Sequence, residues 1–308
     1  MISSTRVAAH YSQDSSVLAS IKSSLDSLGI THPTPDDLSA VDEFHVGGVA
    51  ATESLLAQLS IASTDKVLDI GCGIGGAARW VATRYKGATV VGVDLTPEYV
   101  ETGNALNQMC GGACAENIQL IEGSATDLAS CLTATGNTFD KAFMLHVGMN
   151  IADKQKLMAD VAVQLKVGGQ LAVYDIMRVG ENKHQALEYP VPWAADETMD
   201  FSCADDDYRA AAADAGLSLI AERNCHDTAL VFFDQMKAAR EKAAAKAAAT
   251  TTTAASAATT APPLGLNILM GADFPVKMGN IVGNIKKGKI APYEMVFEKM
   301  TGMDSSNM

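Results

Sequence analysis

Residues 67–76 read VLDIGCGIGG, an apolar run followed by four glycines within six residues. The run 66–70 predicts a buried β-strand, and the glycines predict a turn into a helix over 77–83. Glycine lets a backbone approach a ligand closely, and the N–H groups of the next helix then face that ligand. The stretch therefore predicts a nucleotide-binding turn at the start of an α/β sheet.

Strand-like and helical segments alternate through the middle of the chain. Apolar, β-branched runs predict four further strands, at residues 88–94, 118–122, 141–145 and 170–175. Between them lie helical patterns such as 153–165, where Leu157, Val161 and Leu165 share one face. This alternation is typical of a doubly wound, mostly parallel sheet, and we expect it to form a core over residues 61–226.

The segment before this core, residues 1–60, is predicted to be a helical cover. Apolar residues recur at helical spacing from Val17 to Leu28, and a second helix is expected over 48–59. Pro33 and Pro35 interrupt the pattern between these helices.

The segment after the core is predicted to be a helical lid over 227–290. A long helix over 228–249 gives way to a flexible Ala/Thr linker at 243–261, which has little apolar surface to bury. The last strand, 291–300, alternates in polarity and is expected to pair antiparallel with 217–223 at the sheet edge.

Charge and composition restrict the class of partner. The 308 residues carry a formal net charge of −13, so the surface repels phosphate backbones, and no nucleic-acid partner is expected. We expect neither a membrane span, which needs about 18 consecutive apolar residues, nor a signal peptide. Six scattered cysteines suit a reducing compartment, so a cytoplasmic enzyme, monomeric or homodimeric, is expected.

Acidic residues follow the first strands in a pattern that suggests which nucleotide is bound. Asp94 ends the second strand, where a carboxylate accepts the hydroxyls of a ribose. Gly71, Gly73 and Gly76 also fit G-x-G-x-x-G, so a nicotinamide dinucleotide is an alternative. Asp69, inside the first strand, favours a ligand with an ammonium group over one with a pyrophosphate.

Together these motifs resemble the class I S-adenosylmethionine-dependent methyltransferases over about residues 60–180. The resemblance implies a seven-stranded Rossmann-like sheet with S-adenosylmethionine as cofactor. It places Asp69 near the methionine part, Asp94 on the ribose and Asp127 near the adenine. The further cofactor-binding residues that it implies are Gly71, Gly73, Gly75, Leu95, Ala125 and His146.

Four other motifs look like one small-molecule branch of this superfamily. They are DEFHVGG at 42–48, HVGMNI at 146–151, YPVPW at 189–193 and PPLGL at 262–266. This branch contains enzymes similar to sarcosine/dimethylglycine N-methyltransferases and to ubiquinone/menaquinone C-methyltransferases, although the Ala/Thr tract departs from it. The resemblance implies that Tyr11, His45, Tyr189 and Trp193 approach the methyl acceptor.

Several side chains could act on that acceptor. An amine must lose a proton before methylation, and His146 or His45 could accept it, with Tyr11 as a third catalytic candidate. Arg178 could pair with a substrate carboxylate. We expect the acceptor to be bound by Arg178, Tyr189, Trp193 and Asn150, and we expect no metal.

The acceptor itself remains open at this point. N-methylation of a small sarcosine- or dimethylglycine-like amine is the leading hypothesis. S-methylation of a methylthio acid such as 4-methylthio-2-hydroxybutyrate, towards dimethylsulfoniopropionate, would need no base. C- or O-methylation of a quinone or phenol precursor is a third reading, and the low aromatic content, 6%, weighs against it. Arsenite methylation and a non-catalytic regulator are the remaining alternatives.

Overall fold

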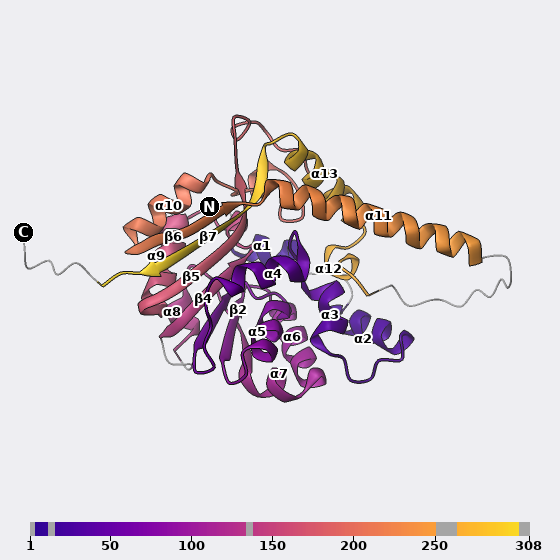
Figure 1. Cartoon of the computed structure of the whole chain (residues 1–308), viewed down its shortest axis with the longest axis horizontal. Coiled ribbons are helices and arrows are strands. Elements are labelled where there is room, and N and C mark those ends of the chain that lie inside the picture. Colours follow the sequence, from indigo (N-terminus) through magenta and orange to yellow (C-terminus); the bar gives the residue numbers. More distant parts are fainter. Residues whose placement is uncertain (1–3, 12–15, 134–137, 251–263, 302–308) are drawn as a thin grey trace, which may run out of the picture.

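The computed structural model describes residues 4–11, 16–133, 138–250 and 264–301. Seven strands form one sheet in the order β3-β2-β1-β4-β5-β7-β6. The first five run parallel: β1 (Lys66–Ile70), β2 (Thr89–Asp94), β3 (Ile118–Glu122), β4 (Phe139–Leu145) and β5 (Leu165–Arg178). Strand β7 (Ile290–Lys299) lies antiparallel between β5 and β6 (Leu217–Asn224), so the predicted doubly wound, mostly parallel sheet is confirmed (Figure 1).

Helices cover both faces of the sheet, because buried strands present apolar side chains alternately to either side. On β5, Leu171 and Val173 belong to one core cluster, and Ala172 and Tyr174 belong to the other. The first cluster includes residues of α8 (Leu128–Cys131), α9 (Lys154–Gln164) and α10 (Asp205–Asp214). The second includes residues of α4 (Gly48–Ala57), α5 (Gly76–Arg84), α6 (Pro97–Cys110) and α7 (Gly112–Asn117).

The N-terminal segment forms three further helices, α1 (Ser4–Tyr11), α2 (Val17–Ser27) and α3 (Pro35–Asp42). Pro35 begins α3 instead of interrupting a helix, because its fixed φ suits the first helical position. Thr34 caps this helix, with its hydroxyl accepting from the N–H of Asp37. A cluster of apolar side chains joins α2 and α3 to α6 and to α12 (Asn267–Met270).

The segment between β6 and β7 contains α11 (His226–Thr250), α12 and α13 (Phe274–Lys286). Figure 1 shows α11 extending away from the sheet. This helix confirms the one predicted over 228–249. Residues 243–250, which the sequence analysis also assigns to the flexible linker, are helical, because alanine is the strongest helix former. Residues 251–261 of the predicted linker lie outside the described residues.

Strand β7 pairs antiparallel with β6, as predicted for residues 291–300 and 217–223. It is nevertheless buried on both faces for most of its length, because it lies inside the sheet, and β6 forms the edge. Within the described ranges, every helix is too short or too polar to cross a lipid bilayer.

A buried arginine joins the glycine-rich turn to the N-terminal helices. Arg79 of α5 is fully buried, and its Nη2 lies 2.8 Å from Oδ2 of Asp42 and 2.7 Å from the carbonyl oxygen of Ile74. Its Nη1 donates to Oδ1 of Asn107 on α6 at 2.7 Å. One guanidinium therefore holds α3, the turn and α6 together.

Removing this guanidinium should leave the buried Asp42 carboxylate without its ionic partner. We expect Arg79→Met to lower the free energy of unfolding by about 3–5 kcal/mol, the usual cost of breaking a buried pair. The control is Arg84→Met on the same helix, where the arginine is exposed and lies over the Trp80 ring; it should cost less than about 1 kcal/mol. Urea unfolding of both variants measures the difference, and equal losses would contradict this role for Arg79.

Candidate active site

A cavity of about 970 Å³ lies at the carboxyl ends of β1, β2 and β4. The neighbours of β1 in the sheet are β2 on one side and β4 on the other, so the chain order reverses here. Open α/β sheets bind ligands at such a switch point. Residues of α1, α3, α11, α12 and α13 complete the lining, so the helices on either side of the core in sequence meet over one site.

The glycine-rich turn forms one wall of this cavity. Gly71 and Gly73 line it with φ values of +71° and +53°, which other residues rarely adopt. A side chain at position 71 would also clash with Val147. Gly75, with φ +87°, is the N-cap of α5 and is absent from the described lining; a Cβ there would lie 3.0 Å from Cδ1 of Leu120 and 3.2 Å from Nη1 of Arg79. The absence of a side chain at position 75 therefore allows the turn to pack closely against Arg79.

Asp94 holds this turn from the end of β2. Its Oδ2 accepts the N–H of Gly73 at 2.8 Å, and its Oδ1 accepts the N–H of Thr96 at 2.9 Å. Burial raises the pKa of this carboxyl, and the two hydrogen bonds partly oppose that increase. Leu95 and Ala125 line the cavity near the same strand ends.

Asp69 is a buried carboxylate with one oxygen that makes no hydrogen bond within the described part of the chain. It lies in β1 and is 2% exposed, and its Oδ2 has no hydrogen-bond partner among the residues that the structure describes. Burial raises its pKa well above the ordinary value, and the nearby Asp94 and Glu43 add to the effect. Because Asp69 lines the cavity, a ligand's ammonium group could supply the missing partner.

His146 follows β4 in an unusual backbone conformation. Its φ is +54°, in the left-handed region that histidine seldom occupies, and its N–H donates to the carbonyl oxygen of Tyr174 at 2.7 Å. The imidazole stacks on Tyr174, with ring centroids 5.2 Å apart. Its Nε2 is buried without a partner in the described part of the chain, and burial holds its pKa well below the ordinary value. The ring is therefore neutral and can exchange a proton.

His45 meets His146 edge to face, with ring centroids 5.9 Å apart. Its Nε2 lies 3.1 Å from the carbonyl oxygen of Gly48 and 3.0 Å from Oγ1 of Thr52, which itself donates to Oε2 of Glu43 at 2.6 Å. A carbonyl oxygen only accepts, so Nε2 carries the proton and Nδ1 of the neutral ring is the acceptor. Burial lowers the pKa of His45 to about 4.

Glu43 is a site residue that the sequence analysis did not identify, although it lies in the DEFHVGG motif. Its Oε2 lies 3.4 Å from Nε2 of His45, and both side chains are 5% exposed. Burial, together with the charge of Asp42, raises the pKa of Glu43 to about 7. Ionisation of Glu43 near neutral pH therefore changes the proton affinity of His45.

Three of the predicted acceptor-side residues also meet in the cavity. Tyr11 of α1 donates its hydroxyl proton to Oδ1 of Asn150 at 3.1 Å, and both residues line the cavity. Asn150 ends the short 3₁₀ helix Gly148–Asn150 that follows His146. Trp193, 1% exposed, contributes another part of the wall.

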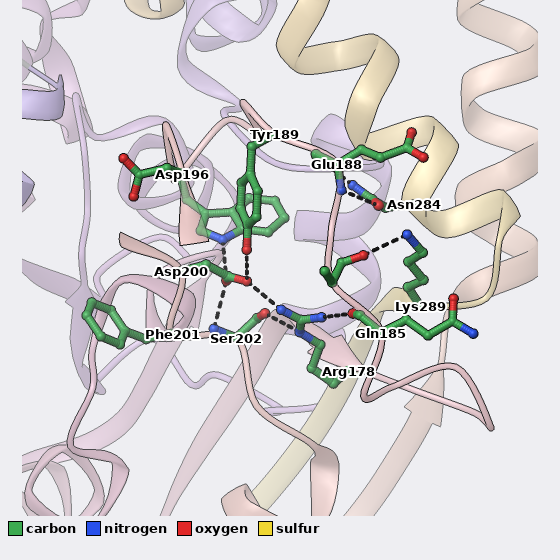
Figure 2. Close-up of polar contacts among 12 residues, drawn as sticks. Arg178, Gln185, Glu188, Tyr189, Asp196, Asp200, Phe201, Ser202, Asn284 and Lys289 are labelled. Carbon is green, nitrogen blue, oxygen red and sulfur yellow. Dashed lines mark hydrogen bonds and ion pairs between the residues drawn. The ribbon is translucent and has the colours of Figure 1, made fainter. Parts of the chain in front are cut away.

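The structure places three other predicted residues outside the described lining. Asp127 accepts a hydrogen bond from the hydroxyl of Ser130 at 2.8 Å, at the start of α8. Arg178 and Tyr189 both turn to Asp200: the Arg178 guanidinium lies 2.7 Å from Oδ2 of Asp200, and the Tyr189 hydroxyl donates to the same oxygen at 2.8 Å (Figure 2). Arg178 thus pairs with the Asp200 carboxylate of this chain, whereas the sequence analysis expected it to pair with a substrate carboxylate.

Asp200 is a second residue that sequence reasoning missed. Its side chain is 1% exposed, and its Oδ1 accepts the N–H of Ser202 at 3.0 Å (Figure 2). The same oxygen accepts Nε1–H of Trp193 at 2.9 Å. Burial alone would raise its pKa, but the hydrogen bonds from Trp193 and Ser202 hold the pKa below the ordinary value. This one carboxylate therefore orients the Trp193 wall of the cavity.

The polar wall of the cavity fits S-adenosylmethionine. That cofactor carries an ammonium, which suits the unpartnered Asp69, and a ribose, which suits Asp94. Gly73 has open space beside its Cα, so a ligand can approach the backbone of the turn closely there. Among the described residues no group of three or more His, Cys, Asp or Glu side chains could hold a metal ion.

Comparison with known proteins agrees with this geometry. Residues 67–169 match the methyltransferase domain family. The chain is 31% identical over 143 residues to methyltransferase GfsG of Streptomyces halstedii, covering 46% of this chain and 48% of that protein. It is 34% identical over 134 residues to phosphoethanolamine N-methyltransferase of Triticum aestivum, covering 43% of this chain and 24% of that protein. The match thus spans at most about half the length of these curated relatives.

A solved structure shares the fold over nearly the whole chain. Geranyl diphosphate C-methyltransferase from Streptomyces coelicolor A3(2), in a complex that includes S-adenosyl-L-homocysteine, superposes with a TM-score of 0.61 and 16% identity. The alignment covers 96% of this chain and 97% of that one. The family match over residues 67–169, the strand order and the cavity at the switch point together agree with a class I S-adenosylmethionine-dependent methyltransferase domain in this part of the chain.

Proposed function

We propose that this chain transfers the methyl group of S-adenosylmethionine to a small-molecule acceptor bound in the same cavity. One observation carries the proposal: the unpartnered Asp69 carboxylate and the glycine-rich turn face the same space as His45 and His146. When bound, the cofactor supplies a methyl group on a positively charged sulfur. The protein has to align the acceptor with that carbon and exclude water, and such alignment is worth roughly 7–11 kcal/mol.

The neutral histidines support an acceptor that must lose a proton. Burial lowers the pKa values of both imidazoles, so each is neutral at neutral pH. The lowered pKa makes each ring a weaker base, and an ionised Glu43 beside His45 raises the proton affinity of that ring. We therefore keep N-methylation of an amine as the first candidate, with O-methylation of a phenol second. S-methylation of a thioether would leave this pair of imidazoles without a chemical task.

The small amino acid of the leading hypothesis receives less support from the cavity. Arg178, the residue expected to hold its carboxylate, lies outside the described lining and pairs with Asp200. An unpaired carboxylate is costly to bury, so a sarcosine-like acceptor would need another cation. We therefore keep an amine as the group that is methylated, and we no longer expect the acceptor to carry a carboxylate.

Asp94 provides the test of the cofactor site. We expect Asp94→Ala to lower the affinity for S-adenosylmethionine at least tenfold, because a hydrogen bond to a charged group contributes about 1.5–3 kcal/mol. Asp127→Ala is the matched control, since Asp127 binds Ser130 and should leave the affinity within about twofold. Calorimetric titration measures both, and unchanged binding by a folded Asp94→Ala variant would reject the cofactor assignment.

The second test concerns the proton. The pKa of Glu43 is raised to about 7, so this carboxyl is neutral below that pH and ionised above it. An ionised Glu43 strengthens His45 as a proton acceptor, so kcat/KM should rise through about pH 7, and Glu43→Gln should flatten that rise without changing cofactor affinity.

The acceptor for these measurements is the best substrate in a methyl-transfer screen of amines, phenols and thioethers. Loss of the base, in His45→Ala or His146→Ala, should slow transfer about 10²–10⁴-fold. A flat pH profile with activity that survives loss of either histidine would exclude a base-dependent reaction and leave the thioether reading.

A further inference from the structure

One part of the cavity, called here the apolar end, is built from apolar side chains. Helices α11, α12 and α13 contribute them, together with Trp193 from the segment after β5. The side chains that face the cavity from these helices include Phe232, Phe233, Met236, Met270, Met278 and Ile281. Removing apolar ligand surface from water against such a wall is favourable, whereas a polar ligand would lose its hydration there.

The cavity is large enough to hold the cofactor together with an acceptor. At about 970 Å³ it lies at the upper end of the roughly 300–1,000 Å³ that small-molecule sites occupy. The cofactor groups that fit Asp69 and Asp94 account for the polar end. An acceptor such as sarcosine has little apolar surface to place against the side chains of the apolar end, whereas an acceptor with a hydrocarbon body can cover them.

Three of the apolar residues are methionines, Met236, Met270 and Met278. Methionine is unbranched and flexible, and its polarisable sulfur adapts to ligands of different shapes. Phe232 and Phe233 lie beside them and add flat apolar surface, with their own ring centroids 5.4 Å apart. This combination suits an extended or cyclic hydrocarbon body better than a compact charged one.

The charges around the cavity disfavour an anionic acceptor. Five acidic residues line it, Asp42, Glu43, Asp69, Asp94 and Asp153, and of these Asp42 is paired with the Arg79 guanidinium. Among the described lining residues, Lys156 is the one lysine or arginine, and its Nζ already lies 3.0 Å from Oδ2 of Asp160. An acceptor carboxylate or phosphate would therefore meet like charge near the strand ends and hydrocarbon at the helices.

Resting on the proposed function, we infer that the methyl acceptor has an apolar body, binds between Trp193 and the helices α11–α13, and carries no carboxylate or phosphate. The atom that receives the methyl group lies at the histidine end of the cavity, and the apolar body fills the methionine-rich end. Recognition comes from burial of hydrocarbon instead of an ion pair, so the site distinguishes acceptors by charge and apolar area.

Binding of matched compounds to the protein saturated with S-adenosylhomocysteine tests this assignment without relying on turnover. N-benzylglycine methyl ester and N-benzylglycine share the amine and the ring and differ in the carboxylate; sarcosine lacks the ring. We expect the ester to bind at least about tenfold more tightly than the acid, and the acid more tightly than sarcosine, because the site offers apolar surface and no free cation among its described residues. Equal or tighter binding of the acid or of sarcosine would overturn the inference.

A cation placed in the apolar end should change that preference. Met278→Arg on α13 should bring the ester and acid affinities to within about threefold of each other or reverse them, because the new guanidinium pairs with the carboxylate. Val276→Arg is the matched control, since Val276 lies on the same helix and is 54% exposed; its preference should equal that of the unaltered protein. An identical preference in both variants would contradict the location of the acceptor.

Met278→Ala serves if the arginine variant does not fold. It should weaken the ester severalfold, because apolar contact is lost, and leave S-adenosylhomocysteine binding unchanged. The two levels of the proposal fail in different ways. A folded protein that does not bind S-adenosylhomocysteine would reject the proposed function and this inference with it, whereas normal cofactor binding with preference for the acid would reject the acceptor class alone.

Discussion

The buried pair of Arg79 and Asp42 is the constraint on which the site depends. The guanidinium also binds the carbonyl oxygen of Ile74, so the conformation of the glycine-rich turn is tied to helix α3. The approach is so close that a Cβ at position 76 would lie 2.6 Å from the carbonyl oxygen of Asp42. Because α3 leads directly into Glu43 and His45, the same pair that shapes the cofactor wall also sets the position of the acid–histidine pair.

Local signals in the sequence were sufficient for the sheet and for the cofactor turn. Strand periodicity and the glycines of residues 71–76 depend on neighbours along the chain, and the structure agrees with them. The local errors arose where one residue type permits two structures. Proline breaks a helix interior but suits a first position, as at Pro35, and alanine is common in linkers but extends α11 through residues 243–250.

The acceptor side could be predicted only in part, because its contacts join residues far apart in sequence. His45, His146, Tyr11, Asn150 and Trp193 do meet in one cavity. Arg178, in contrast, is 22 residues from Asp200, and nothing in the spacing indicates that this carboxylate takes the guanidinium first. A charged side chain near a strand end is a candidate for a ligand only after the partners within the chain have been considered, and those partners lie in irregular segments without periodicity.

Burial gives the cavity its chemical character by acting in opposite directions on its two kinds of titratable group. It raises the pKa values of Asp69, Asp94 and Glu43 and lowers those of His45 and His146. A buried carboxylate is destabilised by the loss of hydration, so it favours a ligand with a positive charge. A neutral imidazole can accept a proton, so it favours an acceptor that has one to lose. Burial also strengthens the attraction between these carboxylates and a cation. The apolar side chains of the helices provide the surface that the apolar body of an acceptor can cover. The positive charge of the cofactor and the absence of an anionic group on the acceptor thus follow from one distribution of charged and apolar side chains around the cavity.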